Sequence, residues 1–410
     1  MLDRFRATRA RYPSQFWLLV TGLFISTIGT SMIWPFMTIY VAERLDLPLT
    51  DVAWIITLNG FVALFASFIA GPITDRFGRK WIMVFSLIGN GITYFLLSQA
   101  GTLPSITILM SLRGLFQPLY RVANNTMVSD LIPPEQRADA FAIVRMSNNA
   151  GVAIGPAIGG FVVVNSYSTS FVAAAVALIT YGLLIAFRAK ETIPEIQEAV
   201  LGEQSRFKGY GRIIRDREFM SFLFAFTLFR ICSAMLWILL AVYAKQNYQV
   251  LESQYGLIQM TNALMVVLFQ VGVTGVTKRY LPLPVLALGT LVYALGVGSI
   301  ALGQGFWGFW LSLVIVTTGE LMIMPTSSTF VANLAPVEMR GRYMGAFAFA
   351  PGVGRSIAPI IGGLLNDQIG PKAIWLGGGL IGLTSAFSYG LMSRKYTPKQ
   401  QTSPAADKDP

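Results

Sequence analysis

DLIPPEQRADAFAIVRMSNNAGVAIGPAIGG, residues 130–160, has a near copy 203 positions later, NLAPVEMRGRYMGAFAFAPGVGRSIAPIIGG, residues 333–363. Ten of the 31 aligned positions are identical, and the alignment has no gap. The same shift superposes three further pairs of equivalent residues, Trp34 on Trp237, Tyr40 on Tyr243 and Arg76 on Arg279. The chain is therefore a duplication, and we expect two halves that repeat the same elements in the same orientation.

Long apolar runs make up the rest of the chain. Of the 410 residues 54% are hydrophobic and 12% are charged, whereas soluble domains carry about 25% charged residues. Runs of roughly 20 apolar residues are long enough to cross a bilayer as a helix. Twelve such runs lie at about 16–41, 52–73, 81–99, 105–130, 139–164, 169–187, 219–244, 254–276, 283–303, 306–331, 343–366 and 372–392.

The fold class predicted from these runs is an all-α membrane protein, with twelve transmembrane helices in two pseudo-symmetric six-helix halves. The duplication divides the chain into an N-terminal half over 1–190 and a C-terminal half over 218–395. A polar stretch of mixed charge, 191–217, is the predicted cytoplasmic linker, and 396–410 is the predicted disordered tail. The first apolar run is too long for the core of a cleaved signal peptide.

The basic residues are unevenly placed between the two sides of the membrane. With the amino terminus inside, 23 of the 31 Lys and Arg fall in the termini and inner loops. Only Arg44, Lys245 and Lys372 fall outside. This distribution predicts a multi-pass protein of the cell membrane with both termini in the cytoplasm. The net charge of +11 then points to membrane lipid headgroups rather than to nucleic acid.

Several classes of protein are excluded by composition. The chain has no histidine, and its single cysteine, Cys232, has no partner for an internal disulfide. A metal site of imidazole or thiolate ligands is therefore not expected, and neither is a Ser-His or Cys-His catalytic pair. No phosphate-binding loop of the Walker type is present. We expect a monomer without a cofactor and without enzymatic activity.

GPITDRFGRK, residues 71–80, lies between the second and third runs. A cytoplasmic loop needs only positive charge to orient the chain in the membrane, whereas this loop has the specific order Gly-x-x-x-Asp-Arg-x-Gly-Arg-Lys. This loop resembles the signature loop of the major facilitator superfamily, and the number of spans, the duplication and the linker agree with that family over essentially the whole chain. The resemblance implies a major facilitator fold and a conformational latch made of Gly71, Asp75, Arg76, Gly78, Arg79, Asp130 and Arg137.

Within such a latch, the resemblance implies a role for each carboxylate. Asp75 would cap a helix and meet a cation across the interface, and Asp130 would meet the loop arginines. Gly71 would let a helix end pack closely. The second copy of the loop is degenerate, because Lys278, Arg279 and Tyr280 replace its Asp-Arg-Phe and leave no carboxylate.

GVAIGPAIGG in the fifth run carries glycines at Gly151, Gly155, Gly159 and Gly160 around Pro156. Small residues at this spacing let helices approach closely, and ordinary helix packing is one reading of the pattern. The pattern also resembles the antiporter motif of the drug:proton antiporter branch, where it tightens the seam between the halves. That resemblance favours an exporter over an importer.

TTGELMIMP, residues 317–325, places Glu320 in a run that has no other charged residue between Phe306 and Val331. Five arginines also fall within runs, although Arg145 is close enough to the inner end of its run to reach the surface. The resemblance implies that the first, fourth, seventh and tenth spans line a central cavity. The candidate cavity residues are Met32, Trp34, Arg113, Gln117, Arg121, Asn124, Arg230, Trp237, Glu320 and Arg355.

Glu320 and Arg113 are the candidates for proton coupling. Arg113 matches the family pattern only in part, because Gln117 follows four residues later and Pro118 stands where glycine is usual. The 203-residue shift places Gln117 over Glu320, so this position is polar in both halves and ionisable in one. Two roles stay open for Glu320: a proton carrier, or a permanent ion-pair partner of Arg230 or Arg355.

These observations support two transport hypotheses and one other. The first is a secondary transporter that works by alternating access, a proton-coupled exporter of small amphipathic compounds. The alternative is a transporter of an anionic substrate, such as an organic anion, a sugar phosphate or a lysolipid, bound by the cavity arginines. A membrane sensor or scaffold is the third.

Overall fold

The computed structural model of the chain describes residues 11–133, 136–192, 210–336 and 339–395. These residues form helices joined by short turns, and no strand occurs among them. Most of the predicted linker and the whole predicted tail lie outside the described residues.

The N-terminal half contains the predicted six spans, of which the first is divided into three helices. Its elements are α2 (Ser14–Ile33), η1 (Trp34–Phe36), α3 (Met37–Leu45), α4 (Leu49–Phe77), α5 (Arg79–Leu97), α6 (Leu103–Leu131), α7 (Arg137–Asn165) and α8 (Tyr167–Arg188).

The C-terminal half repeats this order after one short helix. Its elements are α9 (Tyr210–Arg215), α10 (Arg217–Tyr248), α11 (Glu252–Thr277), α12 (Pro282–Ser299), α13 (Gly305–Leu334), α14 (Arg340–Gln368) and α15 (Ala373–Lys395). The predicted fold class, twelve membrane helices in two six-helix halves, is confirmed.

One span differs from the others in polarity. Eleven spans of the described chain are long and apolar enough to cross a membrane by composition alone, and α6 is not among them. This helix carries Arg113, Gln117, Arg121, Asn124 and Asn125, which lower its mean hydropathy. A helix that is packed within a bundle tolerates such residues when they face a cavity or a partner.

The first span of each half shows how one residue changes a helix. A proline in mid-helix removes a backbone hydrogen bond and clashes with the preceding turn. Pro35 lies in the 3-10 turn η1, which separates α2 from α3. The position equivalent by the 203-residue shift is Ile238, and α10 runs unbroken from Arg217 to Tyr248.

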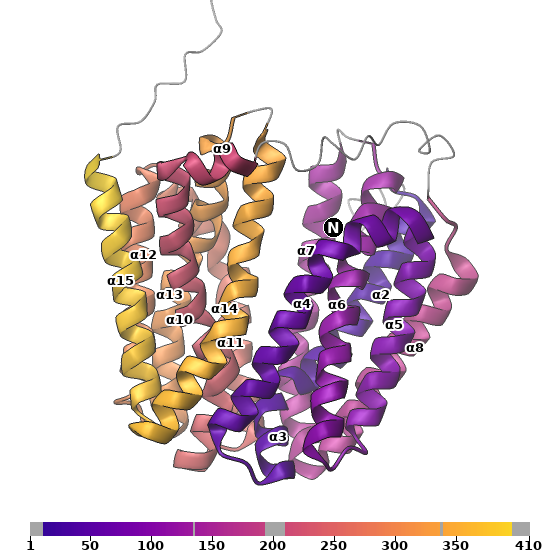
Figure 1. Cartoon of the computed structure of the whole chain (residues 1–410), viewed down its shortest axis with the longest axis horizontal. Helices are drawn as coiled ribbons and strands as arrows, with labels where there is room; N and C mark the ends of the chain where they lie inside the picture. Colours follow the sequence, from indigo (N-terminus) through magenta and orange to yellow (C-terminus); the bar gives the residue numbers. More distant parts are fainter. Residues whose placement is uncertain (1–10, 134–135, 193–209, 337–338, 396–410) are drawn as a thin grey trace, which may run out of the picture.

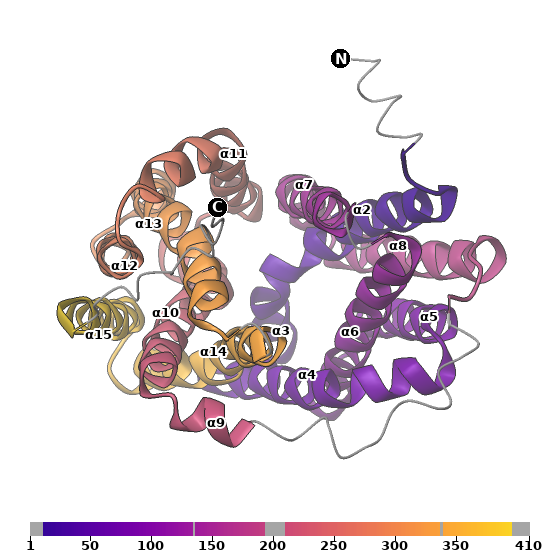
Figure 2. The same ribbon diagram turned by 90° about the horizontal axis from the view of Figure 1, so that it is seen from above.

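The two halves stand side by side and meet along two seams (Figures 1 and 2). One seam pairs α4 with α14, and the other pairs α7 with α11. In each seam the second span of one half packs against the fifth span of the other, so the seams are related by the internal symmetry. We call the face that holds α9 the inner face and the face that holds the start of α4 the outer face.

The seam between α4 and α14 is close at the outer face. A Cβ built on Gly363 would lie 2.8 Å from Thr50 Cα, and one built on Gly60 would lie 3.1 Å from Ser356 Cα. Contact continues inward to Phe68 and Phe349, whose ring centroids are 5.6 Å apart.

Further inward the same seam opens. A Cβ on Gly71 or on Gly345 would meet nothing within 4 Å. The close packing expected at Gly71 is therefore absent in this conformation, because the halves diverge before they reach it (Figure 1). The molecule is closed at the outer face and open at the inner face.

Candidate functional site

Arginines from both halves face one another in the middle of the molecule. Arg355 on α14 lies within electrostatic range of Arg230 on α10 and of Arg121 and Arg113 on α6. Arg121 and Arg355 are exposed and Arg230 is half-buried. Since these arginines lie near the middle of their helices, the space that exposes them is the opening between the halves, and its lining is strongly cationic.

Arg113 differs from the other three because it is fixed within the N-terminal half. It is 5% exposed, and its Nε donates a hydrogen bond of 2.9 Å to the Tyr94 hydroxyl. Its guanidinium lies 4.2 Å from the ring centroid of Trp34, a cation–π distance. Arg113 is thus held between the kinked first span and α5, which leaves it less free to bind a substrate than Arg121 or Arg355.

Glu320 on α13 is half-buried and takes part in no ion pair among the described residues. Its Oε2 accepts a hydrogen bond of 3.1 Å from Asn262 Nδ2 on α11. The same nitrogen donates to Thr317 Oγ1 at 2.9 Å. Arg230 acts on the carboxylate electrostatically from α10 without a direct ion pair. The described residues therefore show no fixed ion pair between Glu320 and Arg230 or Arg355.

Two buried polar atoms beside Glu320 have no hydrogen-bond partner in the described chain. They are Arg230 Nε and the hydroxyl of Tyr293 on α12, and both groups interact electrostatically with Glu320. A buried donor without a partner costs about 1–3 kcal/mol, so such atoms are commonly met by water or by a ligand. The surroundings of Glu320 are polar enough to hold water.

The remaining predicted cavity residues occupy different positions. Gln117 is exposed on α6, whereas Asn124 is 4% exposed and its Oδ1 has no partner among the described residues. Trp237 is half-buried on α10. Met32 is buried against α7, where a Cβ on Gly159 would lie 2.1 Å from the Met32 carbonyl oxygen.

The predicted latch residues are assembled at the inner end of the N-terminal half. Arg79 Nε lies 3.0 Å from Asp130 Oδ2, so Asp130 meets a loop arginine as expected. Arg79 also lies 3.5 Å from Asp75. Gly78 has φ +94°, a conformation that glycine adopts readily, and it turns the chain from α4 into α5. Arg76 is exposed.

Arg137 has a different task in this latch. Its Nε donates to the carbonyl oxygens of Ser129 and Ile132, each at 3.1 Å, at the carboxyl end of α6. A cation at this end of a helix satisfies free carbonyls and complements the helix dipole.

The start of the linker is bound to the same loop. The Glu191 carboxylate accepts hydrogen bonds from the backbone N–H groups of Arg79, at 3.0 Å, and Lys80, at 3.1 Å. Thr192 Oγ1 donates to Asp130 Oδ2 at 3.0 Å. We call Asp75, Arg79, Asp130, Glu191 and Thr192 the latch network.

The glycines of the antiporter-like motif on α7 face two partners. Built Cβ atoms on Gly151 and Gly155 would lie 2.8 Å from Thr27 and 2.5 Å from Ser31 on α2, in the same half. Gly159 faces α2 as well. By contrast, a Cβ on Gly160 would lie 2.5 Å from the Glu252 carbonyl oxygen of α11, in the other half.

Pro156 belongs to this second contact, because its carbonyl oxygen would lie 2.4 Å from a Cβ on Gly256. Part of the motif therefore packs within one half, and part of it forms the seam with α11.

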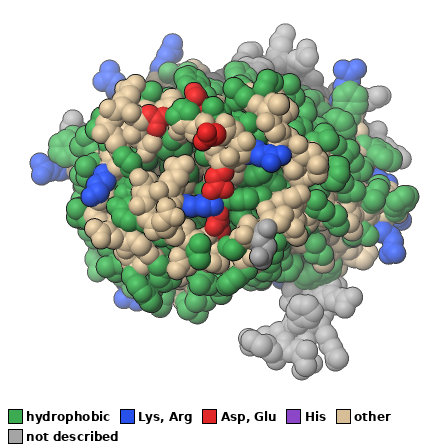
Figure 3. Space-filling view, turned by 90° about the horizontal axis from the view of Figure 1, so that it is seen from below, with side chains coloured by type: hydrophobic (Ala, Val, Ile, Leu, Met, Phe, Trp, Pro, Cys, Tyr) green, Lys and Arg blue, Asp and Glu red, His purple; other side chains and the backbone are tan. Residues whose placement is uncertain are grey.

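Charged residues at the outer face, which the sequence did not indicate as a site, connect the halves. Lys245 Nζ lies 2.6 Å from Glu43 Oε1 and also forms an ion pair with Glu252. The Tyr167 hydroxyl donates to Glu252 Oε1 at 2.7 Å. Glu43 and Tyr167 belong to the N-terminal half, and Lys245 and Glu252 to the C-terminal half. We call these four residues the outer network; Figure 3 shows acidic side chains gathered near the middle of this face.

Asn262 is the other functional residue that the sequence reasoning missed, although a signal for it exists. The 203-residue shift places Asn59 over Asn262. Asn59 on α4 donates to the Met110 carbonyl oxygen of α6 at 2.6 Å, as Asn262 on α11 donates to α13. The asparagine at equivalent positions in the second span of each half therefore indicates a hydrogen bond to the fourth span of the same half.

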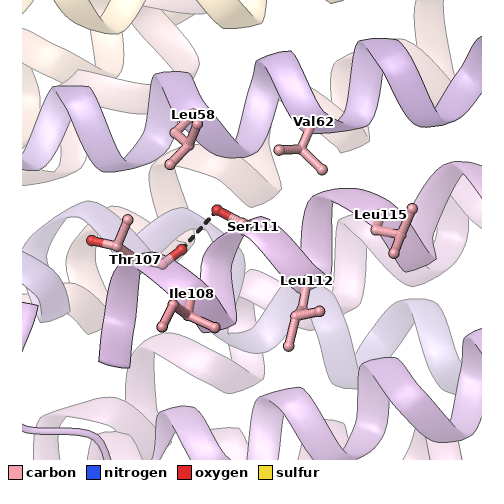
Figure 4. Close-up of a pocket in the computed structure, with 7 residues that line it drawn as sticks. All are labelled: Leu58, Val62, Thr107, Ile108, Ser111, Leu112 and Leu115. Atoms are coloured by element: carbon pink, nitrogen blue, oxygen red, sulfur yellow. Dashed lines mark hydrogen bonds between the residues drawn. The ribbon is translucent and has the colours of Figure 1, made fainter. Parts of the chain in front are cut away.

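A groove of about 350 Å³ lies elsewhere, between α4 and α6 near the outer face (Figure 4). Its lining is almost entirely apolar, with Leu58, Ile108 and Leu112 among its residues. The hydroxyls of Thr107 and Ser111 are bonded to carbonyl oxygens of their own helix. The groove lies on the side of α6 away from Arg113, and its chemistry suits hydrocarbon chains of the bilayer rather than a polar substrate.

Comparison with known proteins agrees with this arrangement. A family model described as Major Facilitator Superfamily matches residues 19–350 and again 222–409. The chain is 28% identical over 370 residues, 83% of its length and 87% of the relative's, to a "Na(+), Li(+), K(+)/H(+) antiporter" of Planococcus maritimus. It is 22% identical over 402 residues, 97% of its length and 98% of the relative's, to "Multidrug resistance protein MdtH" of Salmonella arizonae.

Among solved structures, the nucleoside transporter NupG superposes with a TM-score of 0.79 at 15% identity, over 94% of this chain and 100% of that one. The matched family model covers more than half of the chain, and the relatives are transporters rather than enzymes. The chain therefore belongs to the Major Facilitator Superfamily and is a multi-pass membrane transporter.

Proposed function

We propose that this transporter is a proton-coupled antiporter that exports small amphipathic compounds. The observation that carries the proposal is the environment of Glu320: within the described chain, this membrane carboxylate is hydrogen-bonded to an uncharged amide and forms no ion pair. Burial disfavours the charged form of a carboxylate, and a nearby guanidinium favours it. A carboxyl poised between these influences gains and loses a proton more readily than one fixed in an ion pair.

Two further findings support this direction. The relatives include one named as a cation/proton antiporter and one named as a multidrug resistance protein. The open inner face gives access from the side where the basic loops predict the cytoplasm. A substrate would enter there, and protonation of Glu320 from the outer side would accompany its release.

A pH-gradient assay in proteoliposomes tests the proposal. Uptake of a chemically mixed panel, including cationic dyes and neutral amphipathic drugs, is followed together with proton flux for the wild type, Glu320→Gln and Asp51→Asn. Asp51 is an exposed carboxylate at the start of α4 and serves as the control. We expect substrate-dependent proton flux in the wild type and the control and none in Glu320→Gln. Proton flux that persists in Glu320→Gln contradicts the assignment.

The orientation of the chain belongs to the same proposal, with both termini in the cytoplasm and the protein in the cell membrane. A tag fused after residue 410 should be protected from an impermeant protease in intact cells. Cleavage of the tag from outside would show that the carboxyl terminus is extracellular, and the open inner face would then be on the outside of the cell, which contradicts the proposed export.

A second function, transport of an anionic compound, is supported by the arginine cluster. Arg113, Arg121, Arg230 and Arg355 come together from three helices, and Glu320 is the carboxylate beside them. Arginines bind carboxylates and phosphates through paired hydrogen bonds. The partners of Arg113 in its own half leave Arg121, Arg230 and Arg355 as the groups available to an anion.

Direct binding separates the two candidates. Affinities for matched cationic and anionic amphiphiles are measured for the wild type, Arg355→Ala and Arg188→Ala, an exposed arginine at the end of α8. For an anionic substrate we expect Arg355→Ala to weaken binding about tenfold or more, since one charge-assisted contact contributes about 1.5–3 kcal/mol. Preference for cations, unchanged in Arg355→Ala, would favour the first candidate.

A further inference from the structure

We infer that Asn262 is the positioning residue for Glu320 and that it carries the protonation state of this carboxyl to α11. The inference rests on the proposed function, in which Glu320 is the proton carrier. The inference adds that α11 is the helix that moves when Glu320 is protonated.

The contacts of Asn262 place it between the two groups. Its Nδ2 lies 3.1 Å from Glu320 Oε2 and 2.9 Å from Thr317 Oγ1, and both acceptors are on α13. Two N–H bonds of one amide nitrogen satisfy both acceptors, and this arrangement suits an ionised Glu320, which only accepts hydrogen bonds.

Protonation of Glu320 changes what the amide must do. A protonated carboxyl presents an O–H donor, which the amide nitrogen of Asn262 does not accept. Rotation of the amide would bring its oxygen toward Glu320 and Thr317, and both hydroxyl groups would then donate to it. The Thr317 hydroxyl now donates to the Leu313 carbonyl oxygen at 2.7 Å and would give up that bond. A protonated carboxyl retains one accepting oxygen, so the inference is that the site switches to this second arrangement, which only the protonated form can make.

Other polar contacts between α11 and α13 lack this property. Trp310 donates to Thr261 at 3.0 Å, and Gln270 donates to the Leu321 carbonyl oxygen at 3.0 Å. Neither bond includes a group that titrates near neutral pH. The charged or titratable groups that act on Glu320 from neighbouring helices are Arg230 and Tyr293, and neither forms a hydrogen bond with it among the described residues.

The outer end of α11 connects this site to the seam. Glu252, ten residues before Asn262 and about 15 Å along the helix, belongs to the outer network. Gly256 lies between them and packs on Pro156 of α7, with 2.4 Å from its built Cβ to the proline carbonyl oxygen. A small movement of α11 against α13 at Asn262 would therefore also displace Gly256 and Glu252, whose contacts close the outer face.

The repeat supplies a matched comparison. Asn59 occupies the equivalent position in the N-terminal half and binds a backbone carbonyl of α6 instead of a carboxylate. Position 117, the equivalent of Glu320 by the 203-residue shift, is glutamine. An asparagine therefore links the second and fourth spans of both halves, and only one of the two asparagines meets the proposed proton carrier.

The test uses spin labels at the outer face of the full-length protein in nanodiscs. Gln99 and Lys372 are exposed residues in the outer turns of the two halves, and they are changed to cysteine in a Cys232→Ala background. The distance distribution is recorded as a function of pH for the wild type, Glu320→Gln, Asn262→Leu and Asn59→Leu. Leucine keeps the branched shape of the asparagine side chain and removes its hydrogen bonds.

We expect the outer distance to titrate in the wild type and to be independent of pH in Glu320→Gln. In Asn262→Leu the carboxylate loses its donor, so the midpoint should move upward by about one pH unit. Asn59→Leu should keep the wild-type midpoint. Asn262→Ala gives the same readout if the leucine variant does not yield monodisperse protein.

The outcomes separate the inference from the proposed function. A wild type without a pH response, or a Glu320→Gln variant that titrates normally, overturns the proposed function and the inference with it. A normal loss of response in Glu320→Gln, combined with an unshifted midpoint in both Asn262 variants, overturns the inference alone. An equal shift in Asn59→Leu would also overturn it, because helix packing would then explain both.

Discussion

The outer network and the latch network use the same kinds of side chain and connect different parts of the molecule. In the outer network, Lys245 and Glu252 of the C-terminal half meet Glu43 and Tyr167 of the N-terminal half. In the latch network, the ion pair between Arg79 and Asp130 stays within one half. The outer network therefore resists separation of the halves, and the contact between Arg79 and Asp130 does not.

In the proposed alternating access, this difference gives the two faces separate roles. Opening of the outer face must break the Lys245–Glu43 ion pair and the Tyr167–Glu252 hydrogen bond, whereas the latch ion pair of Arg79 is already made while the inner face is open. Breaking these contacts costs free energy, because Glu43 loses its cation and Glu252, which is 4% exposed, loses the hydroxyl that donates to it. We therefore expect the outer network to set much of the free-energy difference between the two conformations, and the latch network to stabilise the N-terminal half in both.

The largest effect is expected for Lys245→Met, which removes the cation of the outer network. Glu252, 4% exposed, would be left with the Tyr167 hydroxyl, and Glu43 without an ion pair. Because Glu252 is buried in the closed conformation, leaving it without its cation costs about 3 kcal/mol there, so the closed outer face should lose most of its population. Spin labels at positions 99 and 372 would report a longer outer distance. An unchanged distance would show that contacts other than those of Lys245 keep the outer face closed.

A smaller effect is expected for Gly256→Ala, which changes the seam without changing charge. Its Cβ would lie 2.4 Å from the Pro156 carbonyl oxygen, so α11 and α7 would be forced apart at a cost of about 2 kcal/mol. Gly345→Ala is the control, because its Cβ meets nothing within 4 Å. Measured with the same labels, the first variant should open the outer face and the second should not. Equal behaviour of the two would contradict the seam described here.

Asp130→Ala tests the other side of the comparison. Arg79, 3% exposed, would lose its 3.0 Å contact and keep Asp75 at 3.5 Å. We expect about 1.5 kcal/mol lower stability in unfolding of the purified protein, with the outer label distance unchanged. The result that would count against the comparison is an outer distance as long as that of Lys245→Met.

The smallest effect is expected for Thr38→Val, which removes one uncharged bond across the halves. The Thr38 hydroxyl donates to the Ile238 carbonyl oxygen at 2.9 Å. Loss of this bond costs about 1 kcal/mol, and the ratio of closed to open outer face should fall about fivefold. A shift as large as that of Lys245→Met would show that the ion pairs are not the dominant closing contacts.

Much of the fold could be predicted from the sequence, because the positions of the spans and the symmetry of the halves depend on patterns that are visible in the sequence itself. Apolar runs specify spans, the 203-residue shift specifies the symmetry, and Pro35 against Ile238 explains why one first span is broken. The sequence also indicated which arginines lie within the spans, since charges within apolar runs are rare. The spacing of charges along one helix, however, does not tell which partner a side chain meets.

The unexpected features depend on contacts between distant segments. Tyr94 and Trp34 hold Arg113 inside one half, and neither pairing has a local sequence signal. Lys245 and Glu43 lie near the ends of α10 and α3, 202 positions apart, and meet only because this conformation closes the outer face. Asn262 had a signal in the repeat, its match with Asn59, which becomes meaningful once the helices are placed side by side.

Cysteine cross-linking at the inner end of the α4–α14 seam tests alternating opening of the two faces most directly. The antiparallel register that pairs Gly60 with Ser356 and Leu64 with Gly352 places Gly71 opposite Gly345, although nothing now lies within 4 Å of either built Cβ. Cysteines at Gly71 and Gly345 are introduced in a Cys232→Ala background, with and without Lys245→Met. We expect little cross-linking with Lys245 present and a high yield once the outer network is broken. The same yield in both proteins would contradict the claim that the outer network holds the inner face open.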